Sequence, residues 1–275
     1  MNLSLGFSSC PNDTFIFDAL LHHKIDTEGL NFEAHIEDVE SLNQKANNNV
    51  LNITKLSYHA FAYLTHQYVL LNAGSALGFG VGPLLISKNK DIDVNNANLK
   101  VGIPGKLTTA NFLLSMAYPH LTNKVVLLFS DIEEALLNNE IDLGLIIHEN
   151  RFTYAAKGLH KVMDLGDYWE KESHSAIPLG GIVIQRSLPK EVQEKVDRVI
   201  RRSIEFAFAN PKSSLDFVRM HSQDMTEEVM YQHINLYVNK YSLDLTGLGI
   251  SAVKNMFDMA VEKGIIKEYA EDFIL

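Results

Sequence analysis

Polar side chains follow predicted strands at four places in this sequence. A ligand or substrate site at the edge of a sheet needs polar groups in such positions. The four segments are residues 8–13 (SSCPND), 54–59 (TKLSYH), 105–110 (GKLTTA) and 148–151 (HENR). In open α/β sheets, ligands bind beyond the carboxyl ends of the strands. We therefore expect these segments to supply the residues of a ligand site.

The segment 105–110 is suited to an anion. Glycine allows close approach of the backbone, and the helix expected from Thr108 or Thr109 offers free N–H groups and the positive end of its dipole. A carboxylate or phosphate fits this chemistry, with Thr108, Thr109 and Ala110 as the candidates. The alternative is a helix cap without a ligand. The spacing of a phosphate-binding loop, G-x-x-x-x-G-K-[ST], is absent.

Lys55 and Ser57 lie where a predicted strand gives way to a helix. Lys55 would balance a bound anion, and Ser57 would cap the helix and still donate to a ligand. The alternative is a surface lysine beside an N-cap. Asn12 likewise either caps the first helix or touches ligand, and Cys10 is either a nucleophile or, more in keeping with its type, a small core thiol.

His148 ends an apolar strand and is a candidate proton-transfer group, because an imidazole titrates near neutral pH. A lone histidine is also often structural. The other histidines form no convincing metal set: His22 and His23 are adjacent, and His59 and His66 are seven apart. We therefore expect no metal.

Composition excludes several classes of protein. The 275 residues are 46% hydrophobic, enough for a sizeable core, and a single cysteine forms no internal disulfide. A net charge of −10 disfavours binding to nucleic acid or to an anionic membrane. The first residues lack the pattern of a signal peptide, and no apolar run reaches membrane-spanning length. We expect a cytoplasmic globular protein.

Alternating strand and helix signals predict an α/β protein whose sheets are mainly parallel and covered by helices. Two groups of such units indicate two lobes with a ligand cleft between them. We expect lobe 1 to contain residues 1–87 and 186–275, and lobe 2 to contain residues 88–185. From residue 190 onward we expect helices, ending in a short C-terminal helix after residues 246–263. Aromatic residues of these helices serve either the core or a homodimer interface: Phe206, Phe208, Phe217, Tyr231 and Tyr237.

Five segments together resemble the 1,4-dihydroxy-6-naphthoate synthase family. They are residues 9–19 (SCPNDTFIFDA), 55–60 (KLSYHA), 80–84 (GVGPL), 104–110 (PGKLTTA) and 147–149 (IHE). The first segment is fairly specific to the family, whereas the others are not specific by themselves. The resemblance covers residues 1–190 well and the helical tail more loosely.

The resemblance implies a lyase of menaquinone biosynthesis by the futalosine route, which takes cyclic dehypoxanthine futalosine to 1,4-dihydroxy-6-naphthoate without a redox or metal cofactor. It implies a two-lobed fold like that of type 2 periplasmic binding proteins. His148 matches the family's proton acceptor. The substrate-binding positions fall on Lys55, Leu56, Ser57, Thr109 and Ala110, and we add Asn12 and Thr108 as further cleft candidates.

Three alternatives stay open. A cytoplasmic carboxylate-binding or sensor protein would bind ligand without turnover. A chorismate dehydratase would share the fold, although the signature at residues 9–13 argues against it. An enzyme of pyrimidine-precursor synthesis would need a site richer in histidine and cysteine than this sequence offers.

Overall fold

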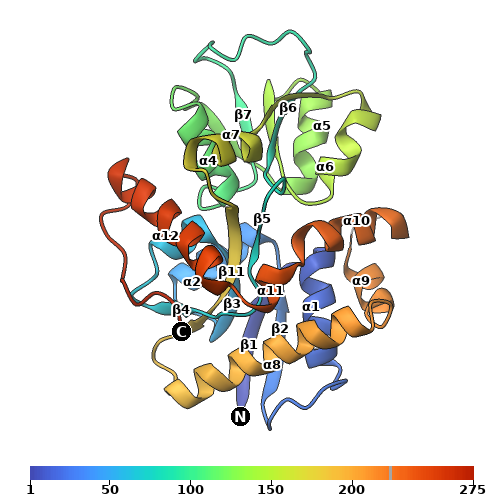
Figure 1. Cartoon of the computed structure of the whole chain (residues 1–275). Coiled ribbons are helices and arrows are strands. Elements are labelled where there is room, and N and C mark those ends of the chain that lie inside the picture. The colour runs from blue at the N-terminus through green and yellow to red at the C-terminus, as the bar shows by residue number, and fades with distance from the viewer. Residues whose placement is uncertain (223–224) are drawn as a thin grey trace. The chain divides into compact units, whose positions relative to one another are not determined.

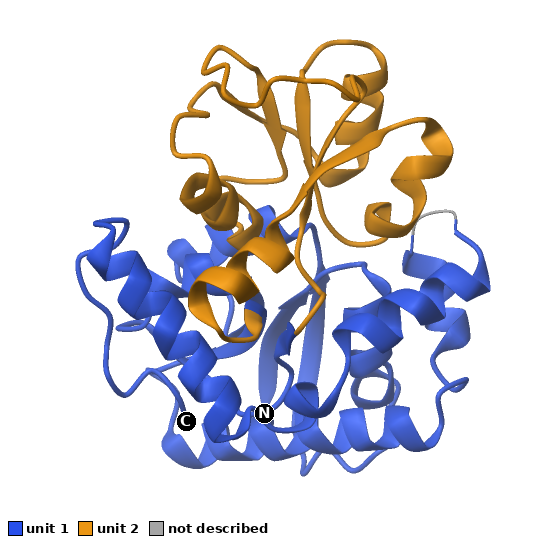
Figure 2. Ribbon diagram, turned by 45° about the horizontal axis from the view of Figure 1, so that its top comes forward, with its two compact units in different colours: residues 1–78, 178–275 blue, residues 79–177 orange. Residues whose placement is uncertain are grey.

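The computed structural model describes residues 1–222 and 225–275 of the chain. It divides into two compact units, coloured in Figure 2. Unit 1 contains Met1–Gly78 and Pro178–Leu275, and unit 2 contains Phe79–Ile177. The chain therefore passes from unit 1 to unit 2, and back to unit 1, at earlier positions than we expected. The strand at residues 84–87 pairs within unit 2, and the strand at residues 177–185 pairs within unit 1.

The sheet of unit 1 has the strand order β2-β1-β3-β11-β4, with β5 paired to β11. Its strands are β1 (Asn2–Phe7), β2 (Asn31–Ile36), β3 (Ile53–Ser57), β4 (Tyr68–Leu70), β5 (Ala76–Gly78) and β11 (Ile177–Gln185). β1 runs parallel to both β2 and β3, whereas β11 is inserted antiparallel between β3 and β4. The return of the chain thus places a reversed strand in an otherwise parallel arrangement.

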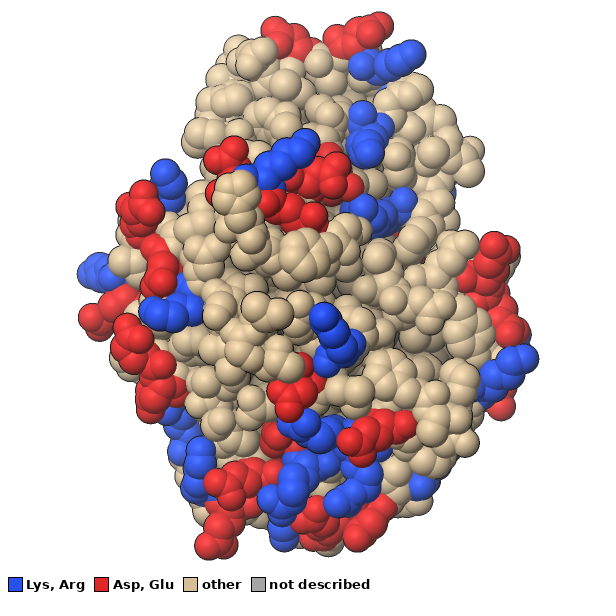
Figure 3. Space-filling model, viewed as in Figure 1, with Lys and Arg blue, Asp and Glu red and all other residues tan. Residues whose placement is uncertain are grey.

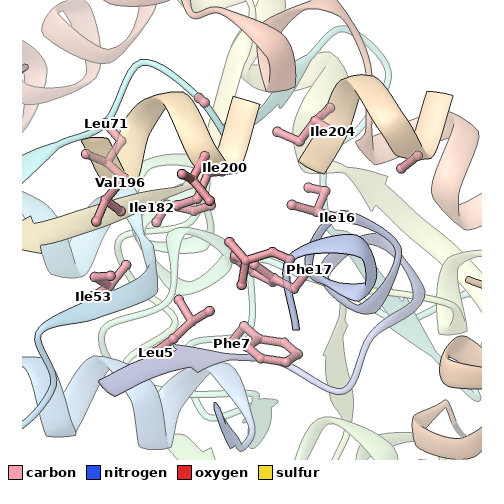
Figure 4. Close-up of a cluster of buried hydrophobic side chains, with 14 of the residues drawn as sticks. Leu5, Phe7, Ile16, Phe17, Ile53, Leu71, Ile182, Val196, Ile200 and Ile204 are labelled. Atoms are coloured by element: carbon pink, nitrogen blue, oxygen red, sulfur yellow. The ribbon is translucent and has the colours of Figure 1, made fainter. Parts of the chain in front are cut away.

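The helices of unit 1 come from both ends of the chain (Figure 1). They are α1 (Pro11–Leu21), α2 (Val39–Asn47), α3 (Tyr58–Ala62), α8 (Lys190–Ala209), α9 (Leu215–His221), α10 (Glu227–Tyr237), α11 (Lys240–Leu243) and α12 (Thr246–Glu262). Figure 4 shows how β1, α1 and α8 share one core, in which Phe7, Phe17 and Ile200 are buried. Burial of such side chains contributes about 1.5–3 kcal/mol each to folding.

The expected short C-terminal helix is wrong. In the described range 263–275 the chain forms turns and then pairs with the edge strand β4. Leu70 donates its N–H to the carbonyl of Phe273 at 2.8 Å and accepts from the N–H of Leu275 at 2.9 Å. The open edge of the sheet offers unpaired backbone groups, and pairing with them replaces a helix that would have been too short to be stable by itself.

Two of the aromatic residues on the C-terminal helices, Phe217 and Tyr231, pack against the core of unit 1, and Tyr237 is buried. Phe208 is 39% exposed. Core packing therefore accounts for most of this set.

The sheet of unit 2 has the order β10-β6-β9-β7-β8. Its strands are β6 (Leu84–Ser87), β7 (Val101–Ile103), β8 (Lys124–Val126), β9 (Leu143–Ile146) and β10 (His160–Asp164). β7 runs parallel to its neighbours β8 and β9, and β6 lies between β9 and β10 and runs antiparallel to both. Its helical elements are α4 (Thr109–Ala117), η1 (Phe129–Asp131), α5 (Ile132–Leu137), α6 (Asn150–Thr153), η2 (Tyr154–Lys157) and α7 (Leu165–Ser173).

In each sheet most strands run in one direction, and the strand at which the chain passes between the units, β6 or β11, runs antiparallel to its neighbours. The expectation of an α/β fold with mainly parallel sheets is confirmed.

Acidic and basic side chains are interspersed on the face shown in Figure 3. Among the described residues, no helix has the length and apolar character needed to cross a membrane.

Candidate functional site

Lys55 is a buried residue on β3 and not the surface lysine of the alternative interpretation, which is wrong. Its side chain is 8% exposed. The ammonium donates to the carbonyl of Gly74 at 2.6 Å, and Nζ lies 3.6 Å from Oδ1 of Asp13. Burial lowers the pKa of Lys55, and the negative charge of Asp13 opposes that shift. A buried cation with a nearby carboxylate is well suited to hold a second anion.

Ser57 ends β3 and begins α3, as the sequence predicted, but its hydroxyl makes no cap hydrogen bond. Instead the side chain of Asn43 holds the residue: the N–H of Ser57 donates to Oδ1 of Asn43 at 3.0 Å, and Nδ2 of Asn43 donates to Oγ of Ser57 at 3.2 Å. A hydroxyl that accepts one bond keeps its own proton for another partner. Ser57 is thus equipped to donate to a ligand.

Leu56 lies between these two polar residues and opposite Gly181 of β11. The neighbouring Gly180 pairs with Ser57, and a Cβ atom on Gly180 would come 2.6 Å from the carbonyl oxygen of Leu56. Only glycine permits the two strands to approach this closely. The backbone of Leu56 is therefore held firmly, as its role in shaping a site would require.

Asn12 lies in the first turn of α1, one position beyond the N-terminal proline, Pro11. The N-cap is Cys10, so the capping interpretation of Asn12 is wrong; its Nδ2 donates instead to Oδ1 of Asp13 at 2.8 Å. Cys10 is buried, in agreement with a core thiol. In unit 1 the candidates Asn12 and Lys55 thus approach the same oxygen atom of one carboxylate, that of Asp13.

In unit 2, Thr108 is the N-cap of α4. Its Oγ1 accepts from the N–H of Asn111 at 3.2 Å and donates to the carbonyl of Gly105 at 2.9 Å. These bonds bear out the cap interpretation for Thr108. Thr109 and Ala110 form the first turn of the helix and are buried. Because helix N-termini attract anions through backbone N–H groups and the dipole, the backbone of Thr109 and Ala110 is the part of this segment suited to a carboxylate.

His148 lies two residues beyond β9, in a left-handed backbone conformation with φ of 57°. A residue with a Cβ atom adopts this conformation at a cost of about 1–2 kcal/mol. The imidazole is partly exposed and packs edge-on against the ring of Phe129, with centroids 5.0 Å apart and planes at 70°. Such strain concentrates at functional sites, so the backbone of His148 is in keeping with a role in the site.

The segment after His148 is tied down by ionic contacts. Arg151 donates from Nη2 to Oδ2 of Asp164 at 2.9 Å and from Nη1 to the carbonyl of Gly82. Glu149 is buried, and its Oε2 has no hydrogen-bond partner among the residues that the structure describes. Burial raises the pKa of Glu149, and the charge of Glu133 raises it further. A buried carboxyl with a raised pKa thus follows the candidate base directly in the sequence.

The two candidate segments of unit 2 share one sheet edge. Residues 104–110 follow β7 and His148 follows β9, and these two strands are parallel neighbours with Gly102 opposite Gly144. Among the residues that the structure describes, no three His, Cys, Asp or Glu side chains are grouped as a metal site would require.

Sequence reasoning missed the contact of Asp13 with Lys55 and the burial of Glu149. The carboxyl group of Asp13 in the first helical turn was visible in the sequence, but its buried partner Lys55 lies 42 positions away on β3. No spacing rule would have paired the two.

Comparison with known proteins gives consistent results. A family model described as menaquinone biosynthesis matches residues 3–262. A protein of Thermus thermophilus named 1,4-dihydroxy-6-naphthoate synthase is 42% identical over 263 residues, which are 96% of this chain and 95% of that protein. A protein of the same name from Streptomyces coelicolor is 34% identical over 275 residues, with 98% and 96% covered.

Solved structures agree on the fold. A protein from Archaeoglobus fulgidus superposes with a TM-score of 0.91 at 37% identity, covering 96% of this chain and 98% of its own. The periplasmic aliphatic sulphonate binding protein of Escherichia coli reaches a TM-score of 0.67 at 10% identity, covering 100% and 92%. The second likeness shows the fold alone, and it confirms the expected periplasmic-binding-protein-like architecture.

Proposed function

Since the chain belongs to the 1,4-dihydroxy-6-naphthoate synthase family of menaquinone biosynthesis, we propose that it is the carbon–carbon lyase that converts cyclic dehypoxanthine futalosine to 1,4-dihydroxy-6-naphthoate. The observation that carries this proposal is the identity of 42% to a relative of that name over almost the whole of both chains. The matched residues include every candidate from Asn12 to His148.

In the proposed mechanism His148 is the general base. The neutral imidazole accepts a proton from the bicyclic substrate, the sugar-derived fragment leaves as a carbon–carbon bond breaks, and aromatisation of the ring drives the reaction. The left-handed turn and the packing of Phe129 against the ring hold the imidazole in one orientation, which supports this role. Such a base contributes about 10²–10⁴-fold to a rate.

For the carboxylate and the sugar hydroxyls of the substrate, we propose binding groups within each unit taken by itself. In unit 1, Lys55 supplies a buried positive charge and Ser57 a hydroxyl donor. In unit 2, Thr109 and Ala110 supply backbone N–H groups at the start of α4. Leu56 contributes backbone and shape, and we retain Asn12 as a binding candidate. Thr108 acts through the cap that orders α4.

The experiment is turnover of cyclic dehypoxanthine futalosine by the wild type and by His148→Asn, with the product identified by mass spectrometry. His120→Asn is the matched control, because His120 is a partly buried histidine of the same unit whose Nε2 lies 2.8 Å from the carbonyl oxygen of Val94. We expect the wild type and His120→Asn to form the naphthoate, and His148→Asn to bind substrate while losing at least about 100-fold in kcat.

Two outcomes would replace the proposal. Binding of small carboxylates by a wild type that turns nothing over would identify a binding module, and turnover of chorismate in a parallel assay would identify a dehydratase. Location in the cytoplasm and a homodimer remain predictions, which cell fractionation and size-exclusion chromatography test.

A further inference from the structure

The carboxylate of Asp13 is the centre of a buried polar cluster in unit 1. Asp13 is 2% exposed. Its Oδ2 accepts from the N–H of Ser8 at 3.1 Å and from the hydroxyl of Ser8 at 2.8 Å. Its Oδ1 accepts from Nδ2 of Asn12 at 2.8 Å and faces Nζ of Lys55 at 3.6 Å. One carboxylate thus gathers donors from three separate elements of the chain.

The topology of unit 1 brings these elements together. β1 and β3 are parallel neighbours, with Gly6 opposite Thr54. Ser8 directly follows β1, and its hydroxyl binds the same carboxylate that Lys55 of β3 faces. Asp13 occupies the third position of α1 and reaches back to that edge. The cluster consequently sits where ligands bind in open α/β sheets.

We propose that Asp13 is a positioning residue of the substrate site, which holds the ammonium of Lys55 and the amide of Asn12 in place to receive the carboxylate of the bicyclic substrate. This inference rests on the proposed function, because it concerns the same reaction. Asp13 acts through Lys55 and Asn12 and needs no contact of its own with the substrate.

A helix-capping role does not account for the whole arrangement. The bonds to Ser8 close the turn before α1, and a cap requires no more than these. A helix cap does not require the buried lysine on β3, whose positive charge would be costly without a nearby anion. The lysine ammonium has three donors, and the carbonyl of Gly74 and the carboxylate of Asp13 occupy two directions. The third direction suits an incoming carboxylate.

The charged surroundings of Lys55 make the inference testable by pH. Asp13, from α1, is the charged group that acts on the ammonium, and Gly74 faces it with a neutral carbonyl. Tyr58, which follows β3, donates or accepts with Ser75 at 2.7 Å, and burial raises the pKa of its hydroxyl, so it stays uncharged. Removal of the Asp13 charge therefore lets the pKa of Lys55 fall further.

The test compares Asp13→Asn with Asp18→Asn. Asp18 is the matched control, because it is a buried carboxylate of the same helix that pairs with Lys24 at 2.7 Å, away from the cluster. The readouts are the pH profile of kcat/KM for cyclic dehypoxanthine futalosine and the dissociation constant of 1,4-dihydroxy-6-naphthoate measured by calorimetry.

For Asp13→Asn we expect KM and the dissociation constant to rise by at least about tenfold. The loss should grow as pH rises, because Lys55 gives up its proton at a lower pH once the charge of Asp13 is removed. Asp18→Asn should keep the pH profile of the wild type. A folded Asp13→Asn with the wild-type pH profile and affinity would overturn the inference and leave Asp13 with a structural role through its bonds to Ser8.

If Asp13→Asn does not fold, the wild type still decides the matter. In protein labelled with ¹³C at lysine Cε, the Lys55 signal is assigned from its loss in Lys55→Gln. We expect this signal to shift when 1,4-dihydroxy-6-naphthoate is added, and a signal that stays unchanged while the ligand binds overturns the inference. A wild type without turnover would instead refute the proposed function, so the two failures are distinguishable.

Discussion

Gly82 permits a close backbone contact that positions the turn beside the candidate base. In Gly82→Ala, the new Cβ atom would lie 2.3 Å from Cα and 2.4 Å from the backbone N of Gly166, at the start of α7. Ordinary van der Waals contact begins at 3.4 Å. The neighbouring atoms belong to backbone and not to a flexible side chain, so the two segments must separate by about 1 Å.

The cost has two sources. Overpacking of this kind costs about 1–3 kcal/mol. The carbonyl of Gly82 also accepts from Nη1 of Arg151, and the next carbonyl, of Pro83, accepts from the N–H of Leu165 at 3.0 Å. Displacement weakens both bonds, so we expect Gly82→Ala to lose about 2–4 kcal/mol of unfolding free energy. Because Arg151 lies three residues after His148, kcat should fall as well.

The assay is urea unfolding followed by the fluorescence of Trp169, the single tryptophan of the chain. Trp169 is fully buried on α7 and donates from Nε1 to the carbonyl of Ala176 at 3.2 Å, so it reports on unit 2. The control is Gly247→Ala on α12, where a Cβ atom would meet nothing within 4 Å. This change should leave the Trp169 transition at or above the wild-type midpoint. A Gly82→Ala protein within about 0.5 kcal/mol of the wild type would refute the steric reasoning.

Two further predictions concern stability in unit 2. Because burial holds the pKa of Glu149 above its usual value, the folded state binds more protons than the unfolded state above pH 4.5, and stability falls as pH rises through this range. The difference in unfolding free energy between Glu149→Gln and the wild type should therefore move in favour of the variant from pH 4 to pH 7, as measured by urea unfolding. An equal difference at both pH values would contradict this. Thr108→Ala should lower the unfolding free energy by about 1 kcal/mol, because the hydrogen bond to Asn111 is lost. Thr108→Ser should keep that bond and the wild-type stability. Equal midpoints of the two variants in thermal unfolding would exclude the cap as the cause.

The sequence by itself determined the parts of this protein that depend on neighbours along the chain. The apolar period of residues 192–208 predicted α8, and the polar segments after β1, β7 and β9 marked the sheet edges where candidate residues lie. The segment 54–59 was expected to follow a strand, but its first four residues belong to β3. The motif at residues 9–19 pointed to the family that the comparisons confirm. These signals are local, since helix periodicity and turn chemistry are written within a few residues.

Tertiary structure alone decided the features that join distant segments. The pairing of Leu70 with Phe273 replaced the expected final helix, and β11 entered the first sheet against its neighbours. The burial of Lys55 beside Asp13 likewise arises from the parallel pairing of β1 with β3. A sheet edge accepts any strand that satisfies its backbone bonds, and the charge state of a buried group depends on what folding places around it. Neither the pairing of distant strands nor the charge state of a buried group can be read from a few neighbouring residues.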